Sequence, residues 1–114
     1  MSWTIEFHED FDREFQGFDD RVQDEILASL RVLEKMGPEL GRPYVDGVKG
    51  SAYPNMKELR IRADGGVWRI AFAFDPERKA VLLAAGDKRG IQETRFYRDL
   101  IRVADRRFAS HLAQ

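Results

Sequence analysis

Residues 56–85 alternate between apolar and polar or small side chains, and this alternation restricts the fold more than any other feature of the chain. The alternation runs through 56–63 and again through 68–74, and the turn signal Asp64-Gly65-Gly66 separates the two segments. A repeat of two residues is typical of a strand with one buried face. After a second turn, the run 80–85 is apolar on both sides, as in a central strand. The segment therefore predicts a three-stranded antiparallel meander.

Apolar side chains one helical turn apart predict helices on both sides of this meander. Val22, Ile26 and Leu30 fall on one face of a helix that Asp19 or Asp20 can cap and that Gly37 ends. The other expected elements are a short strand at 3–7, a helix at 8–15, a loop at 37–55 and a last helix capped by Thr94 and ending near 112. We predict a single α+β domain over residues 1–114, with two N-terminal helices, an antiparallel sheet of three to four strands and a C-terminal helix.

The composition excludes several classes of protein. The chain has no Cys, which excludes disulfides and thiolate chemistry, and it has no apolar run long enough to span a membrane. Its first residues lack the pattern of a signal peptide, so we expect a cytoplasmic protein without a membrane partner. No nucleotide-binding or metal-binding motif occurs, and we expect no cofactor and no metal. His8 and His111 lie near opposite ends of the chain, and we interpret both as structural residues at helix ends.

The net charge of −1 conceals an uneven distribution. Residues 1–48 carry five Lys/Arg and twelve Asp/Glu, a formal charge of −7, whereas residues 49–114 carry fourteen and eight, a charge of +6. A basic half on a nearly neutral protein indicates either a local site for a polyanion or basic residues that merely lie on solvated faces.

The strand pattern places two or three arginines on one face of the meander. Leu59 and Trp68 must lie on the core face, so Arg69 and either Arg62 or Arg60 are opposite each other on the other face. Like charges opposite each other cost roughly 0.2–1 kcal/mol, and a bound polyanion gives a reason to accept that cost. Ala71 and Ala73 share the Arg69 face and predict open space above the sheet. The alternative is a wet polar face on which Glu58 partly offsets the charges.

Further basic residues surround this face in the predicted fold. Lys57 begins the first strand of the meander, and we expect it at the rim of the same surface. Lys88 and Arg89 form a basic loop after the third strand, and we assign them, together with Lys49, to contacts with RNA.

One reaction of RNA needs little more than cations. When a 2′-hydroxyl attacks the neighbouring phosphate, negative charge develops on the phosphoryl oxygens, and fixed Arg and Lys side chains stabilise it. We therefore expect Arg60, Arg62 and Arg69 to be catalytic. Lys57, among other cations, can serve as the base, and Tyr97 or an arginine can assist the leaving oxygen. Tyr97 also shares a stripe with Ile101, so core packing is its alternative role.

The segments Lys57-Glu58-Leu59-Arg60, Trp68-Arg69-Ile70 and Gly86-Asp87-Lys88-Arg89 together resemble the core of the RelE/HigB toxins, most of all the phage Gp49-like HigB branch. The resemblance covers nearly the whole chain. It implies an mRNA endonuclease that acts in the ribosomal A site and is neutralised by an antitoxin, usually a small helix-turn-helix protein of the HigA type. It also implies basic catalytic residues on the sheet and a tyrosine near the last helix.

The same fold also permits a function without RNA cleavage. ParE toxins share it but poison DNA gyrase. A gyrase-poisoning toxin or a non-catalytic module that only binds an antitoxin therefore remains the alternative to an RNase, although the basic sheet favours RNA.

Overall fold

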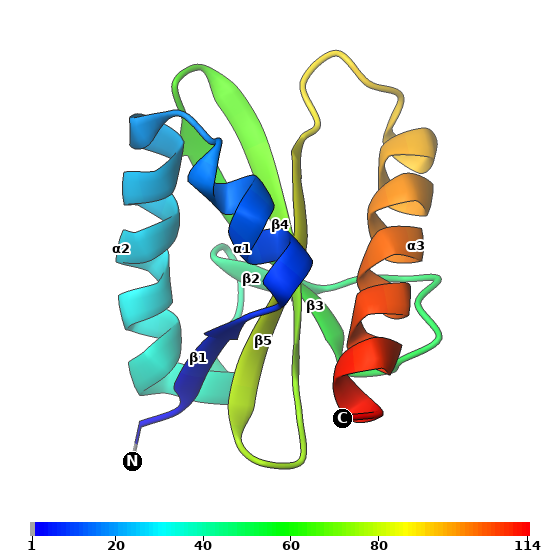
Figure 1. The fold of residues 1–114 in the computed structure, drawn as a ribbon. Helices are drawn as coiled ribbons and strands as arrows, with labels where there is room; N and C mark the ends of the chain where they lie inside the picture. Colours follow the sequence, from blue (N-terminus) through cyan, green and yellow to red (C-terminus); the bar gives the residue numbers. More distant parts are fainter. Residues whose placement is uncertain (1) are drawn as a thin grey trace.

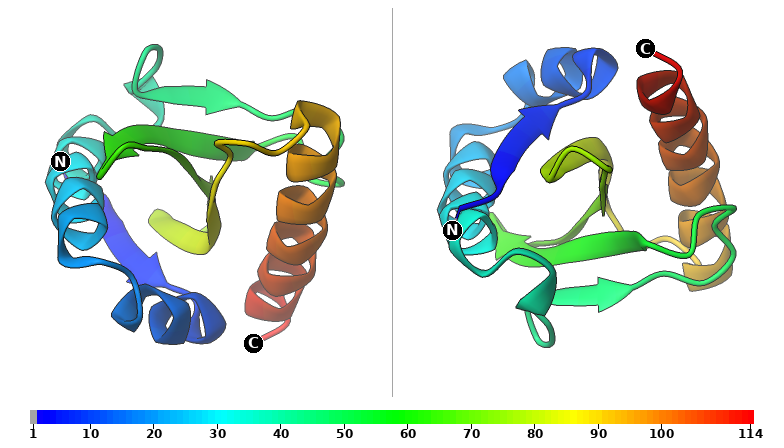
Figure 2. Two further views of the ribbon diagram at one scale, coloured as in Figure 1. Left: turned by 90° about the horizontal axis from the view of Figure 1, so that it is seen from above. Right: turned by 90° about the horizontal axis from the view of Figure 1, so that it is seen from below.

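The computed structural model describes residues 2–114 as three layers, with a sheet between two layers of helices (Figure 1). Helices α1 and α2 cover one face of the sheet, and α3 covers the other face (Figure 2). The elements are β1 (Thr4–Phe7), α1 (Glu9–Gln16), α2 (Asp20–Met36), the 3-10 helix η1 (Gly37–Glu39), β2 (Val45–Gly47), β3 (Met56–Ala63), β4 (Gly66–Phe74), β5 (Lys79–Asp87) and α3 (Glu93–Leu112).

The sheet has the strand order β1-β5-β4-β3-β2. Strands β3, β4 and β5 form the expected antiparallel meander, and β1 joins its edge as expected, although it runs parallel to β5. The fifth strand, β2, was not expected, because its three residues lie in a segment rich in Gly and Pro. It forms because Val45 is buried and pairs with Leu59 on β3.

The helices begin and end close to the predicted residues. The side chain of Asp19 accepts a hydrogen bond from the amide of Arg21, which caps α2, and α2 ends just before Gly37. Helix α3 is capped by Gln92 rather than Thr94, since the Gln92 side chain accepts from the amide of Arg95. None of the helices within residues 2–114 has the length and apolarity needed to cross a membrane.

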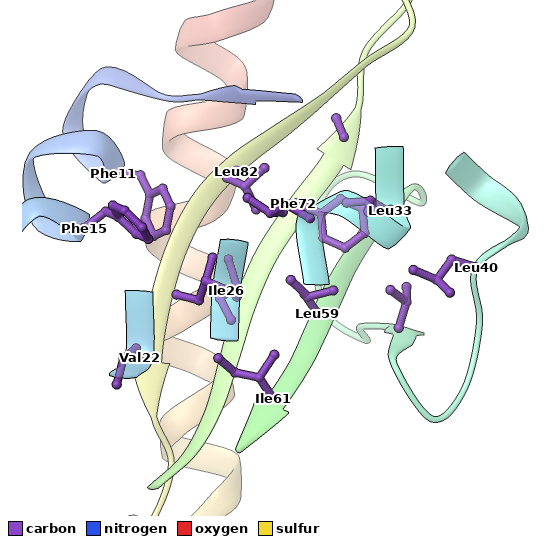
Figure 3. Packing of buried hydrophobic residues seen from close by; sticks show 14 of the residues in the cluster. Phe11, Phe15, Val22, Ile26, Leu33, Leu40, Leu59, Ile61, Phe72 and Leu82 are labelled. Carbon is purple, nitrogen blue, oxygen red and sulfur yellow. The ribbon is translucent and has the colours of Figure 1, made fainter. Parts of the chain in front are cut away.

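The main core lies between the sheet and the two N-terminal helices (Figure 3). Leu59, Ile61 and Ile70 point into it, as the alternation predicts, and all three are buried. Phe11 of α1 and Ile26 of α2 are completely buried against them. Burial of each such side chain contributes about 1.5–3 kcal/mol, so this face holds the N-terminal helices in place.

Helix α3 covers the opposite face of the sheet, so the prediction of open space above Ala71 and Ala73 is wrong. Ala71 and Ala73 are fully buried in a second apolar cluster with Leu100, Ala104 and Phe108 of α3. Their small side chains let the helix approach the sheet closely. Because α3 covers the alanines, the part of this face that stays accessible is the part toward β2 and β3.

Candidate functional site

Arg60 of β3 and Arg69 of β4 are directly opposite each other, which is the second of the two registers that the sequence allowed. Ala63 and Gly66 also pair, so only Asp64 and Gly65 form the turn. The amide of Arg60 donates to the carbonyl of Tyr44 on the β2 side rather than to β4. The arginines therefore form a non-hydrogen-bonded pair, the type that brings side chains closest together.

Glu58 lies on the same face, two residues before Arg60, and is 5% exposed. Its carboxylate is 3.8 Å from the Nε atom of Arg60 and 3.8 Å from that of Arg69. The residue opposite Glu58 is Ala71, whose small side chain leaves room for the Arg69 side chain to lean toward the carboxylate. Glu58 thus offsets the repulsion between the two guanidinium groups, much as the wet-face alternative proposed, but from a buried position.

Tyr97 of α3 completes this cluster. Its hydroxyl donates a hydrogen bond to Oε1 of Glu58 at 2.7 Å. Burial, the hydrogen bond to Glu58 and the negative charge of Glu58 raise the pKa of Tyr97 to about 12, although Arg69 opposes them. Tyr97 also packs against the α3-side apolar cluster. The ring of Tyr97 therefore packs, as its alternative role requires, and its hydroxyl is a hydrogen-bond donor whose raised pKa keeps it protonated at neutral pH.

Gly86 determines how close α3 comes to this cluster. It pairs with Arg69 from β5, and a Cβ atom built on it would lie 3.0 Å from Cε1 of Phe96. Only a residue without a side chain lets the ring of Phe96 pack directly on the strand. The next residue on the helix is Tyr97, so this close contact brings its hydroxyl within reach of Glu58.

A hollow of 430 Å³ opens onto these side chains, and we call it the Glu58 hollow. Lys49, Glu58, Arg60, Lys88 and Tyr97 all line it, so it brings together residues from the β2–β3 loop, β3, the loop after β5 and α3. Lys88 forms an ion pair at 2.9 Å with Glu93, and its Nζ atom lies 5.7 Å from the centre of the Tyr97 ring. Lys88 and Glu93 both line the hollow, so an anion that enters it can compete with the Glu93 carboxylate for Lys88.

Arg69 is the buried member of the cluster, with 6% of its surface exposed. One terminal nitrogen donates to the carbonyl of Trp68 at 3.0 Å. The Nε atom is buried and has no hydrogen-bond acceptor among residues 2–114. A buried donor without an acceptor costs free energy, and the Nε atom of Arg107 is in the same position.

Lys57 does not belong to this cluster, so the expectation that it rims the same surface is wrong. As the neighbour of Glu58, it points to the opposite side of β3. Its Nζ atom donates to the carbonyl of Pro38 at 3.4 Å and lies 5.6 Å from the centre of the Phe74 ring. The strand alternation already implies this, because Lys57 has the same parity as Leu59 and Ile61.

Arg62 and Arg89 lie toward the β3–β4 turn, away from the Glu58 hollow. Arg62 lines a separate hollow of 510 Å³ with Arg60, Arg69 and Tyr44. Arg89 donates to the carbonyl of Gly65 at 2.7 Å, which ties the loop after β5 to the β3–β4 turn. The structure therefore brings Arg60, Tyr97, Lys88 and Lys49 together around Glu58, with Arg69 3.8 Å from its carboxylate, and leaves Lys57, Arg62 and Arg89 outside the Glu58 hollow.

Glu58 is the member of the site that sequence reasoning missed as a functional residue. The signal was present, because the alternation places Glu58 on the Arg60 face, and its partner on β4 is the small residue Ala71. Within residues 2–114, no group of three or more His, Asp or Glu side chains is arranged to hold a metal ion. What the cluster offers is a carboxylate, a protonated phenol and several cations within one hollow.

The sequence is similar to one protein family and to two proteins that are named as toxins. Residues 13–109 match the family described as phage derived protein Gp49-like. The chain is 45% identical over 115 residues to the Mycobacterium tuberculosis protein named "Putative toxin HigB2", covering all of this chain and 56% of that protein. It is 48% identical over 88 residues to "Putative toxin HigB3" of the same organism, covering 77% of this chain and 75% of that protein. The chain thus spans little more than half the length of the first of these relatives.

Two solved structures share the fold. A free arginine double mutant of the E. coli toxin RelE has a TM-score of 0.65 and 14% identity, covering 90% of this chain and 97% of that one. RelE from the archaeal RelE–RelB complex of Pyrococcus horikoshii has a TM-score of 0.56 and 17% identity, covering 81% and 100%. The fold is therefore that of RelE, and the family match over 13–109 shows that this chain belongs to the phage-derived Gp49-like family.

Proposed function

We propose that this protein is the toxin of a type II toxin–antitoxin pair and that it cleaves mRNA on the ribosome. The observation that carries the proposal is the hydrogen bond of 2.7 Å between Tyr97 and Glu58 inside a hollow that Arg60 and Lys88 also line. A proton donor, a proton acceptor and cations in one hollow are the groups that phosphodiester cleavage by a 2′-hydroxyl requires.

Each group has a place in the reaction. Glu58 accepts the proton of the 2′-hydroxyl, the oxygen attacks the adjacent phosphorus, and the bond from phosphorus to the 5′-oxygen breaks. Tyr97 then gives its proton to that leaving oxygen, so the products are a 2′,3′-cyclic phosphate and a 5′-hydroxyl. Glu58 replaces Lys57 in the role of base, because Lys57 lies on the opposite side of the strand.

The cations act on the charge that develops at phosphorus. Arg60 and Lys88 line the hollow directly, whereas Arg69 acts through Glu58, because its buried Nε atom lies 3.8 Å from that carboxylate. Lys88 is now paired with Glu93, and a phosphate can take the place of that carboxylate. Fixed donors of this kind lower the barrier because they need no reorganisation when the charge appears.

The relatives support the wider assignment. The two Mycobacterium tuberculosis relatives are named as toxins, and the archaeal RelE was solved in a complex with RelB. On this basis the partners of the chain are a cognate antitoxin of the helix-turn-helix HigA type, the ribosome and its mRNA. A protein with these partners works in the cytoplasm.

The decisive experiment induces the protein in cells and maps the 5′ ends of their mRNA. We expect new ends inside translated messages, in phase with the codons, and we expect Tyr97→Phe to abolish them. Tyr44→Phe is the matched control, since Tyr44 is 59% exposed and lies outside the Glu58 hollow. Intact messages together with signs of DNA damage would instead assign the chain to the gyrase-poisoning class.

A further inference from the structure

A second hollow of 450 Å³ lies next to the Glu58 hollow, between the loop before β3 and the outer side of α3. The two hollows share Lys49, Thr94 and Tyr97, so one continues into the other. Arg98 and Arg102 line only the second hollow. We call it the flank hollow.

The wall of the flank hollow is held in place by Asp105 of α3. Its carboxylate accepts hydrogen bonds from the Ser51 hydroxyl at 2.5 Å and from the Ala52 amide at 2.8 Å. Just before these residues, Gly50 has a φ of +92°, a conformation that side chains disfavour. The loop that carries Lys49 is therefore fixed against the helix rather than free.

The charges in the flank hollow favour an anion. Lys49, Arg98 and Arg102 line it, and the single carboxylate on its wall, that of Asp105, is already used by the loop. Lys49 makes no ion pair with any residue from 2 to 114. Its neighbours Arg98 and Arg102 pair only with Asp99, at 3.4 and 3.9 Å, with side chains 69% and 71% exposed. Ion pairs this exposed are worth about 0–1 kcal/mol, so a polyanion can displace them.

We infer that the flank hollow binds the phosphate backbone of the same RNA strand that is cut in the Glu58 hollow. This inference rests on the proposed function and adds the path of the substrate. The strand leaves the reacting phosphate beside Tyr97, passes Lys49 and follows α3 along Arg98 and Arg102. Phosphate contacts of this kind position the strand and do not read its sequence.

The test uses two non-cleavable RNAs that carry a 2′-deoxy sugar at the reacting position. One is short enough to fill only the Glu58 hollow, and the other is several nucleotides longer. Binding to the purified chain is measured by fluorescence anisotropy over a range of salt concentrations. We expect the wild type to bind the longer RNA more tightly, and Arg98→Ala with Arg102→Ala to abolish that preference while binding the short RNA unchanged. The slope of log affinity against log salt should become shallower by about 0.7 for each phosphate that the variant no longer neutralises.

Two further variants separate charge from folding. Arg106→Ala removes an exposed arginine of α3 that does not line the flank hollow and should behave as wild type. Arg98→Lys with Arg102→Lys keeps the charges and should restore the preference for the longer RNA. If the alanine double variant keeps that preference, or if the wild type shows none, the inference is overturned.

Failure of the inference differs from failure of the proposed function. If messages are cut in cells but the alanine double variant binds both RNAs like the wild type, only the path of the strand is wrong. If the wild type leaves messages intact and binds neither RNA, both are wrong.

Discussion

The hydroxyl of Tyr97 donates to Glu58 at 2.7 Å, and this bond joins the C-terminal helix to strand β3 across 39 positions of the chain. It is the contact that turns a row of basic strand residues into a site with a proton donor and a proton acceptor. Because the raised pKa keeps Tyr97 protonated, the donor is present throughout the neutral range.

Replacing Tyr97 with Phe should remove the donor and leave the packing of the ring. We expect mRNA cleavage on purified ribosomes to fall by about 100-fold or more, the usual contribution of a positioned acid. Primer extension on a translated message measures the rate, and thermal unfolding shows whether the variant stays folded. A variant that cleaves as fast as wild type would remove Tyr97 from the reaction.

Tyr97 should also have a titration of its own. The chain has three tyrosines, and the ultraviolet absorbance of tyrosinate follows their ionisation. We expect one component with a pKa of about 12, absent in Tyr97→Phe. Since this pKa is raised above the ordinary value of 10.0, the contribution of Tyr97 to stability is complete below pH 10 and is lost as the pH rises through about 12. If the wild type lacks the component with a pKa of about 12, the hydrogen bond to Glu58 is absent in solution.

Glu58→Ala should destabilise the fold, whereas removal of a surface carboxylate should leave the free energy of unfolding nearly unchanged. Removal of Glu58 leaves Arg60 and Arg69 facing each other without a carboxylate, and the buried Arg69 loses its nearest anion. We expect the free energy of unfolding to fall by about 1–3 kcal/mol. Urea unfolding measures this, with Glu39→Ala as an exposed control. Equal stability of the two variants would contradict the proposed balance of charges.

Arg107 should be a structural arginine. It donates to Glu14 through both terminal nitrogens, at 2.9 and 2.6 Å, and to the carbonyl of Leu83 at 2.8 Å. Leu83 is the extra residue where the pairing of β4 and β5 shifts register, so Arg107 satisfies a carbonyl that the irregular ladder exposes. Arg107→Ala should cost about 1–3 kcal/mol in urea unfolding. Arg106→Ala, one position earlier and exposed, should cost almost nothing.

Acid should weaken the contact between the end of α3 and the β4–β5 turn. Burial raises the pKa of Asp75, but hydrogen bonds from His111 and from the amides of Lys79 and Glu77 outweigh it and leave the pKa below 3.8. A lowered carboxyl pKa adds stability above the ordinary value and loses it as the pH falls through the lower one. The stability difference between wild type and Asp75→Asn should therefore shrink below pH 3.8, as measured by urea unfolding at several pH values. A constant difference would exclude this linkage.

Much of the molecule was determined by the sequence alone. A strand has a side-chain period of two, so the alternation at 56–63 and 68–74 identified the meander, its core face and two possible registers for Arg69. The caps at Asp19 and Gly37 bounded α2 in the same local way. Even the position of Lys57 on the opposite side of β3 follows from its parity with Leu59, because alternate residues of a strand face the same side.

Only the tertiary structure decided what covers the Arg69 face. Nothing local in Ala71 or Ala73 tells whether water or a helix lies above them, since both suit small side chains. The burial of Glu58 and its bond to Tyr97 depend on where α3 packs, and that packing joins residues far apart in the chain. Contacts between distant segments depend on how the apolar faces of helices and strands pack together. The side-chain period and the secondary-structure propensity of a single segment do not tell which other segment will pack on it.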